Sequence, residues 1–205
     1  MRILRIPHST NVERVALAAG HKGLAVEWVD VDPRDRGEVK RLSGQELVPV
    51  LVEGDGAVVT GSMEIVRYLD EHHPARPLYP VDPAPRAELA IFVDWFNRLW
   101  KGPPNEIDAE LSRSKPDQER VELLGAAIQG ELTLFEDLLD GRSYLWGEDF
   151  SAADIAAFPF LKFATLWDEG DDVRFHRTLR EWQALGDGYP RLRAWIERVD
   201  ARPRA

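Results

Sequence analysis

The sequence predicts an α/β layered domain followed by an all-α-helical domain. Strand and helix patterns alternate through the first part of the chain, five prolines fall between residues 74 and 85, and no strand pattern follows them. We therefore expect an α/β domain over residues 1–75, a semi-rigid proline-rich linker over residues 76–85, and a helical domain over residues 86–205.

The first domain opens with an apolar strand at residues 2–6. The stretch STNVERVALAAG then has the apolar periodicity of a helix, which we expect to end at Gly20. Thr10 and Glu13 have the spacing of a capping box at its start. LAVEWVDVD predicts a second strand, and the residues from 33 to 44 predict a polar loop.

The stretch ELVPVLVEGDGAVVTGS predicts a β-hairpin with strands at residues 48–52 and 57–60 and a turn at residues 54–56. Pro49 lies inside the first of these strands. Proline has no N–H for a sheet ladder, so it is confined to edges, strand starts and bulges. The next stretch, SMEIVRYLDEHH, predicts a helix that starts at Ser62.

Helical periodicity dominates the second domain. The first apolar stripe comprises Leu89, Phe92, Phe96 and Leu99, and Trp95 and Trp100 widen it. The second stripe runs from Val121 to Leu139 and closes at Gly141. Further helices are predicted at residues 151–167, 174–185 and 190–199.

Composition excludes several kinds of function. The 205 residues include no cysteine, which excludes disulfides, thiolate metal sites and a cysteine nucleophile. The five histidines include no pair with zinc-motif spacing, so we expect no metal site. The net charge of −10 argues against nucleic acid or an anionic membrane as a partner. No apolar run has membrane-spanning length and no signal peptide is evident, so we expect a cytoplasmic protein.

Charge is distributed unevenly along the chain. Residues 1–50 carry 8 Lys/Arg and 7 Asp/Glu, a net of +1, whereas the remaining residues carry 18 and 29, a net of −11. The asymmetry is either chance or a sign that the N-terminal part receives an anionic ligand.

A small strand–helix domain, a proline-rich linker and an all-α domain together resemble the cytosolic glutathione transferase superfamily, in its serine-type, bacterial-like form. VPVL resembles the thioredoxin-fold signature in which a cis proline, here Pro49, precedes the third strand. The resemblance implies a thioredoxin-like first domain in which Val48 turns its N–H and C=O outward to pair with glutathione. The alternative is a trans proline on an edge strand.

SMEIVRYL resembles the family's acid-Ser-x-x-Ile-x-x-Tyr-Leu pattern. The resemblance implies that Ser62 and the N–H groups at the helix start hold the γ-glutamyl carboxylate of glutathione. Gly61 departs from the pattern, because the family has there an acidic residue that helps bind the glutathione ammonium. Either Glu64 or a partner subunit must substitute, or the affinity is weak.

PHSTNVERV matches serine-type transferases through the spacing of Ser9 and Arg14. Tyrosine-type chemistry is excluded here because the first tyrosine is Tyr68. The resemblance implies that the Ser9 hydroxyl donates a hydrogen bond to the glutathione thiolate, with Thr10 or Asn11 as alternative donors.

GEDFSAADIAAFPF resembles the N-capping box of the family's core helix. Ser151 and Asp154 have the capping-box spacing, and Phe150 with Ile155 fits a hydrophobic staple. This motif is structural and carries no catalytic role.

The remaining ligand contacts follow from the resemblance alone. We select Lys40 for the glycine carboxylate, with Arg36 and Arg41 as alternatives, and Trp95 and Arg98 for the second substrate.

The resemblance therefore implies a homodimeric glutathione transferase that acts on a small hydrophobic electrophile, as in detoxification. Two alternatives remain: a glutathione-dependent isomerase or dehalogenase on the same scaffold, and a non-catalytic transferase-like module for protein interactions.

Overall fold

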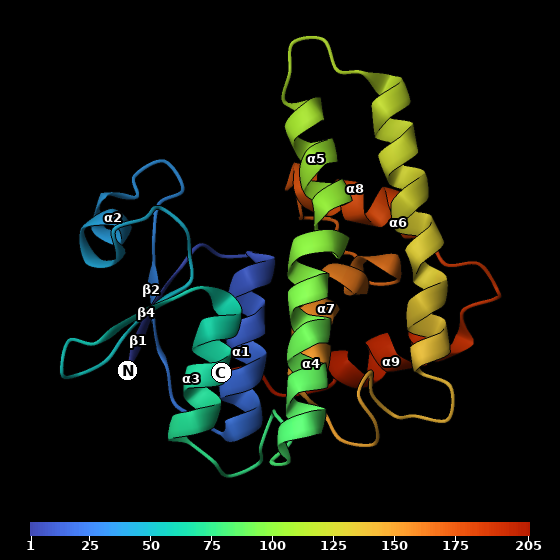
Figure 1. Cartoon of the computed structure of the whole chain (residues 1–205). Helices are drawn as coiled ribbons and strands as arrows, with labels where there is room; N and C mark the ends of the chain where they lie inside the picture. The colour runs from blue at the N-terminus through green and yellow to red at the C-terminus, as the bar shows by residue number, and fades with distance from the viewer. The chain divides into compact units, whose positions relative to one another are not determined.

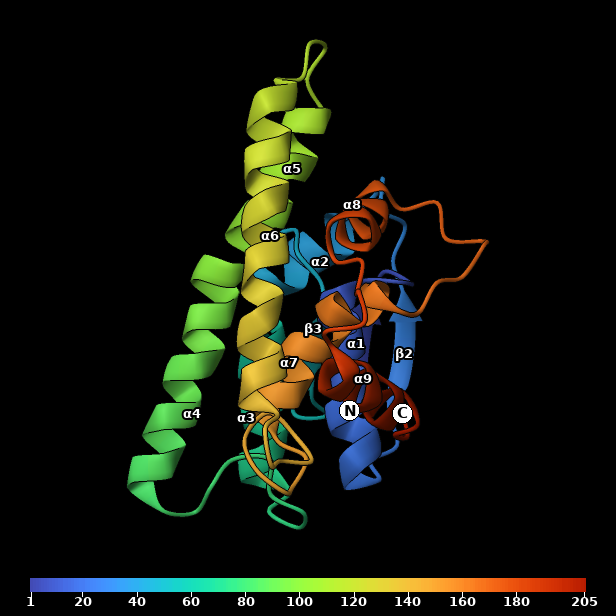
Figure 2. The same ribbon diagram turned by 90° about the vertical axis from the view of Figure 1, so that its right-hand side faces the viewer.

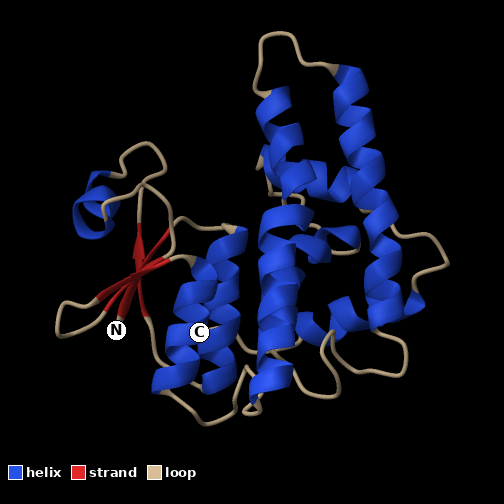
Figure 3. Cartoon of the chain, viewed as in Figure 1, coloured by secondary structure: helices blue, strands red, loops and turns tan.

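The computed structural model describes all 205 residues, which form two compact units. The first unit comprises residues 1–83 together with residues 201–205, and the second comprises residues 84–200. All strands of the central sheet belong to the first unit, and the second unit is helical (Figure 3). Residues 201–205, which the sequence assigns to the helical domain, thus return to the first unit.

The first unit has a thioredoxin-like four-stranded sheet in the order β2-β1-β3-β4. Its strands are β1 (Arg2–Arg5), β2 (Glu27–Asp30), β3 (Val50–Val52) and β4 (Val58–Thr60). β1 pairs with β2 in parallel and with β3 antiparallel, and β3 pairs with β4 antiparallel. The predicted hairpin is present, with strands shorter than the sequence suggests.

Helices cover both faces of this sheet. α1 (Thr10–Lys22) and α3 (Ser62–His72) pack together on one face, and α2 (Gly37–Ser43) lies on the other (Figure 1). The prediction of an uninterrupted loop over residues 33–44 is therefore wrong, because that segment contains α2. Seven residues, most of them polar or charged, were too short a stretch to show a helical period.

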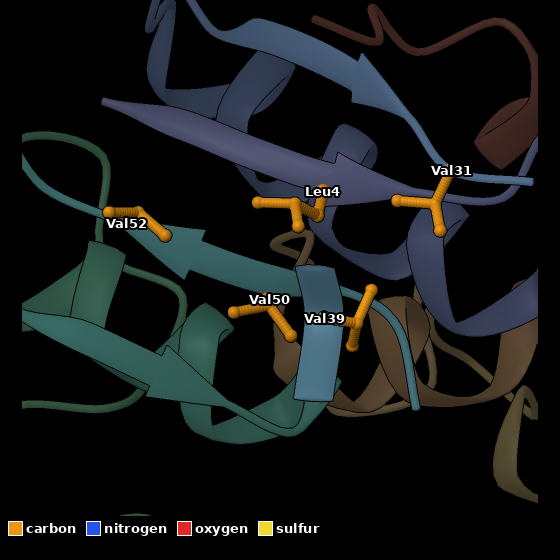
Figure 4. Close-up of a cluster of buried hydrophobic side chains, with 5 residues drawn as sticks. All are labelled: Leu4, Val31, Val39, Val50 and Val52. Carbon is orange, nitrogen blue, oxygen red and sulfur yellow. The ribbon is translucent and has the colours of Figure 1, made fainter. Parts of the chain in front are cut away.

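A small apolar cluster fixes α2 on its face of the sheet. It comprises Leu4, Val31, Val39, Val50 and Val52, all of them buried (Figure 4). Val39 comes from α2. Ile3 and Leu51, which are next to Leu4 and Val50 in the strands, point to the opposite face of the sheet, because side chains alternate along a strand.

α1 differs from its prediction at both ends. It continues through Gly20 to Lys22 and ends at Gly23, whose φ of +68° suits glycine. Its N-cap is Ser9 and not Thr10, so the predicted Thr10–Glu13 capping box does not form the helix start. Gly20 has a different role: a Cβ there would overlap the backbone carbonyl of Pro203. A close tertiary approach, invisible to local pattern, requires this glycine.

A buried ion pair joins the C-terminal ends of α1 and α3. Lys22 Nζ lies 2.7 Å from Asp70 Oδ1, and both side chains are almost fully buried. Lys22 also donates to the His73 carbonyl at 2.7 Å, and Asp70 accepts from the Leu78 N–H at 2.8 Å. These extra hydrogen bonds satisfy both buried charges and hold the chain after α3 against the unit.

The second unit contains six α-helices and two short helical segments (Figure 2). They are α4 (Pro83–Trp95), the π-helical η1 (Phe96–Trp100), α5 (Gly102–Leu111), α6 (Gln118–Leu138), α7 (Ala152–Leu161), the 3₁₀-helical η2 (Lys162–Ala164), α8 (Arg174–Trp182) and α9 (Pro190–Asp200). None of the chain's helices combines the length and apolarity needed to cross a bilayer.

Two local features escaped the sequence pattern. The π-helical η1 adds residues to the turn, so Trp100 is buried and Leu99, predicted on the buried stripe, is 65% exposed. α5 was not predicted because Pro103 and Pro104 interrupt its sequence; both lie in the first turn, where a missing N–H costs no helical hydrogen bond.

The capping box that starts α7 is confirmed. Ser151 is the N-cap, and its N–H and hydroxyl donate to Asp154 Oδ2 at 2.8 and 3.1 Å. The Leu145 N–H and the Trp195 indole N–H donate to Asp154 Oδ1 at 2.9 and 2.8 Å. One fully buried carboxylate therefore satisfies four donors from three parts of the second unit.

We expect Asp154→Ala to lower the free energy of unfolding by about 3 kcal/mol, because it leaves several buried donors without acceptors. The control is Asp117→Ala, which removes the exposed N-cap of α6 and should cost only about 1 kcal/mol. Urea denaturation measures both. Equal losses in the two variants would contradict a core role for Asp154.

Candidate functional site

Strand pairing brings three separate segments of the first unit to one edge of the sheet. Leu4 near the end of β1 pairs with Val50 at the start of β3, and Val50 pairs with Thr60 at the end of β4. The segments that follow β1, precede β3 and follow β4 therefore leave the sheet at the same edge. These segments contain Ser9, Val48–Pro49 and Gly61–Ser62.

The peptide bond between Val48 and Pro49 is cis, as the VPVL motif indicates. The Val48 side chain packs against the apolar cluster beneath α2. Neither its N–H nor its C=O makes a hydrogen bond within the protein. Since unpaired main-chain groups need water or a ligand, this segment offers one donor and one acceptor to a bound molecule with a peptide backbone.

Ser9 lies at the N-cap of α1 with extended backbone angles, yet its hydroxyl makes no capping hydrogen bond. Its main chain is fixed at both ends: the N–H donates to the Ile6 carbonyl at 3.3 Å, and the carbonyl accepts from the Glu13 N–H at 3.0 Å. The side chain is half-buried. The hydroxyl is thus held on an ordered turn and remains available to a ligand.

The two alternative donors are placed differently. Thr10 is the first residue of α1 and is buried. The Asn11 side-chain oxygen lies 3.3 Å from both Ser62 Oγ and Arg14 Nη1, and accepts from each. Asn11 is therefore already engaged in a network between α1 and α3.

Arg14 completes that network from the interior. Its guanidinium is fully buried and Nη1 donates to Ser62 Oγ at 3.2 Å. Burial lowers the pKa of Arg14 to about 9, an effect that the charges of Glu64 and Tyr79 oppose. The contact ties the first turn of α3 to α1 and holds Ser62 in place.

The Glu64 carboxylate lies in the first turn of α3, beside the N–H groups at the start of that helix. Ser62 is the first residue of this 11-residue helix, and its N-cap is Gly61, with a φ of +86°. A Cβ at Gly61 would overlap Oε2 of Glu64 and lie 3.0 Å from its Cδ. The exposed Glu64 carboxylate therefore lies against Gly61, in the space that a side chain at residue 61 would enter.

The three candidates for the glycine carboxylate are already engaged near the site. Lys40 forms an exposed ion pair with Glu46 at 2.9 Å, which lowers the pKa of Glu46. Arg36 donates to the Glu46 carbonyl at 3.0 Å, and Arg41 lies 3.9 Å from Glu38. No group of His, Asp or Glu side chains in the structure is arranged to hold a metal ion.

The two candidates for the second substrate belong to the second unit. Arg98 is exposed and pairs with Asp94 at 2.6 Å. Trp95 is half-buried among aromatic rings, with the Phe92 and Phe135 centroids 5.6 and 6.1 Å away. It also lines a cavity of about 170 Å³, together with Leu99, Trp100, Pro103, Ala127, Ile128 and Glu131.

Comparison with known families agrees with this geometry. Residues 4–77 match the glutathione S-transferase N-terminal domain, and residues 118–198 match the glutathione S-transferase C-terminal domain. The chain belongs to the glutathione S-transferase superfamily. Its structure agrees with this membership in the order of its strands, its cis proline and its helical second unit.

Individual relatives have low sequence identity to this chain but align with most of it. Mouse glutathione S-transferase omega-1 is 29% identical over 176 residues, which covers 84% of this chain and 70% of the relative. FtsZ-localized protein A of Caulobacter vibrioides is 29% identical over 199 residues, covering 88% and 81%. The crystal structure of a glutathione S-transferase from Rhodospirillum rubrum superposes with a TM-score of 0.75 at 27% identity, covering 98% of this chain and 88% of that one.

Proposed function

We propose that this glutathione S-transferase is of the serine type: it binds glutathione at the sheet edge and stabilises the thiolate for attack on a small hydrophobic electrophile. The observation that carries the proposal is the set of unused polar groups at that edge. The Ser9 hydroxyl and the Val48 N–H and C=O make no hydrogen bonds within the protein. An assembly role alone would not require these groups.

The energies are adequate for this role. An ordinary thiol has a pKa near 8.5, and lowering it by about 2 requires roughly 2.7 kcal/mol of preferential anion stabilisation. A hydroxyl donated by Ser9 to a thiolate contributes roughly 1.5–3 kcal/mol, and the N-terminus of α1 adds about 0.3–1 kcal/mol. Ser9 acts as a donor to the anion and not as a nucleophile.

The γ-glutamyl end of glutathione fits the N-terminus of α3. Its carboxylate would accept from the Ser62 hydroxyl and the free N–H groups of the first helical turn. Its ammonium would pair with Glu64, whose carboxylate lies beside Gly61, where the family pattern has an acidic residue. The substitution needs no partner subunit.

The other contacts remain proposals of the same binding mode. Lys40 would exchange its exposed partner Glu46 for the glycine carboxylate, since an exposed ion pair is weak. Trp95 and Arg98 stay the candidates for binding the electrophile.

We expect Ser9→Ala to raise the apparent pKa of bound glutathione by about one to two, because the thiolate loses a charge-assisted hydrogen bond. Binding itself should change little. Ser9→Thr keeps a hydroxyl and is the matched control. The ultraviolet absorbance of the thiolate, followed against pH, gives this pKa. An unchanged pKa in Ser9→Ala would transfer the role to Thr10 or Asn11.

We expect Glu64→Gln to weaken glutathione binding about tenfold, or about 1.4 kcal/mol, because the ammonium loses its charged partner. A glutathione analogue without the α-amino group should bind the wild type and Glu64→Gln equally well. Calorimetry with both ligands forms a double-mutant cycle. Additive losses would show that Glu64 and the ammonium do not interact, and Glu71→Gln controls for the change in net charge.

An assembly role is the second candidate. FtsZ-localized protein A matches along 88% of this chain, and Gly61 removes the acidic residue of the family pattern. Calorimetry on the wild type separates the candidates: no heat at millimolar glutathione would exclude the transferase, together with the isomerase or dehalogenase variant. Given binding, a panel of electrophiles distinguishes these enzymes.

We also expect a homodimer at micromolar concentration. Large apolar side chains are exposed on helices of the second unit, among them Ile91, Leu99 and Leu123. Their burial against a second copy would be favourable at roughly 25 cal/mol per Å² of apolar surface. Light scattering measures the mass, and Leu123→Glu should shift it toward the monomer. A wild-type monomer would contradict this expectation.

A further inference from the structure

The segment of residues 201–205 lies along α1 in the first unit (Figures 1 and 2). Arg202 Nη2 lies 2.8 Å from His21 Nδ1 near the end of the helix. The Ala205 N–H donates to the Ala16 carbonyl at 3.1 Å, and the Trp28 indole N–H donates to the Ala205 carbonyl at 3.0 Å. The segment therefore runs back along α1 toward its N-terminal turn.

Arg204 reaches that first turn. Its Nε and Nη2 donate to Glu13 Oε1 at 3.2 and 3.0 Å, and the side chains of Arg204 and Glu13 are 29% and 15% exposed. Two hydrogen bonds from one guanidinium define the geometry of such a pair better than a single contact does. A carboxylate in the first turn also interacts favourably with the helix dipole.

Glu13 connects this ion pair to the candidate catalytic residue. Its N–H donates to the Ser9 carbonyl at 3.0 Å, so Glu13 and Ser9 share the first hydrogen-bonded turn of α1. An N-cap serine normally stabilises that turn with its own hydroxyl. Here the Ser9 hydroxyl does not cap the helix, so the bonds from Arg204 to Glu13 supply a side-chain anchor that the N-cap does not.

We propose that Arg204 is a positioning residue for Ser9: by binding Glu13 it fixes the first turn of α1 and leaves the Ser9 hydroxyl free for the thiolate. The inference rests on the proposed function. In this arrangement Arg204, in the segment of residues 201–205, anchors the start of α1, and Ser9 binds the thiolate. Arg204 acts through Glu13 and contacts no substrate.

The test compares Arg204→Ala, Arg204→Lys and Glu13→Gln with the wild type. Arg120→Ala is the control for loss of an arginine, because it breaks a more exposed ion pair with Glu106 at 2.8 Å in the second unit. The first readout is amide hydrogen exchange of the Glu13 N–H in the ligand-free protein. The second is the apparent pKa of bound glutathione, measured by thiolate absorbance.

We expect Arg204→Ala and Glu13→Gln to speed exchange of the Glu13 amide several-fold and to raise the thiol pKa by about 0.5, roughly a threefold change in the ionisation equilibrium. Arg204→Lys should restore part of both effects, and Arg120→Ala should change neither. Unchanged exchange or an unchanged thiol pKa in Arg204→Ala overturns the inference, even if the variant melts at a lower temperature.

The same measurements distinguish a failure of the proposed function from a failure of the role of Arg204. If the wild type binds no glutathione, the transferase role and the positioning of Ser9 for a thiolate are both overturned. If the wild type binds glutathione and Ser9→Ala raises the thiol pKa, while Arg204→Ala leaves that pKa unchanged, only the role of Arg204 is overturned.

Discussion

The register between β1, β3 and β4 is the constraint on which the candidate site depends. Antiparallel pairing of β3 with both neighbours forces the chain to leave β1, enter β3 and leave β4 at one edge of the sheet. A register slip of one residue would turn Leu4 and Val50 away from the cluster with Val39, so the core beneath α2 opposes it. The packing that holds the sheet together thus also fixes the location of the site.

Polar contacts hold together α1 and α3, the two helices that pack on one face of the sheet. Arg14 is buried and joins α1 to α3 through Ser62, while Lys22 and Asp70 join the opposite ends of the same helices. Each cation is held by hydrogen bonds, which offset the cost of removing it from water. The two helices are therefore tied to each other at both ends, and their N-termini lie at the edge of the sheet that contains the candidate site.

The sequence predicted those features that depend on neighbouring residues. The VPVL stretch, the helix start at Ser62 and the Ser151–Asp154 box are complete local motifs, and the structure contains all three. Besides α2, which is short, and α5, which contains two prolines, the features that were missed depend on contacts far along the chain or on helix irregularity. Gly20 suits the approach of Pro203, and the π-helical turn exposes Leu99, which the pattern places on the buried stripe. Local periodicity contains neither kind of information.

The candidate site shows the same division. Ser9 and Gly61 could be singled out from short patterns, but the position of the Glu64 carboxylate against Gly61 depends on a side-chain rotamer. The bonds from Asn11 and Arg14 to Ser62 depend on how two helices pack. The spacing of Asn11 and Arg14 on one face of α1 was the available signal for a shared partner.

The return of residues 201–205 to α1 also bears on the order in which the molecule assembles. Glu13 and Arg204 are 191 positions apart in sequence, so a ribosome releases the helix long before it synthesises the arginine. The sheet and its helices can collapse early, but the turn that presents Ser9 gains this anchor only after the whole helical unit has been translated. Nascent chains would thus carry a folded first unit in which the contact between Glu13 and Arg204 forms only after the second unit has been synthesised.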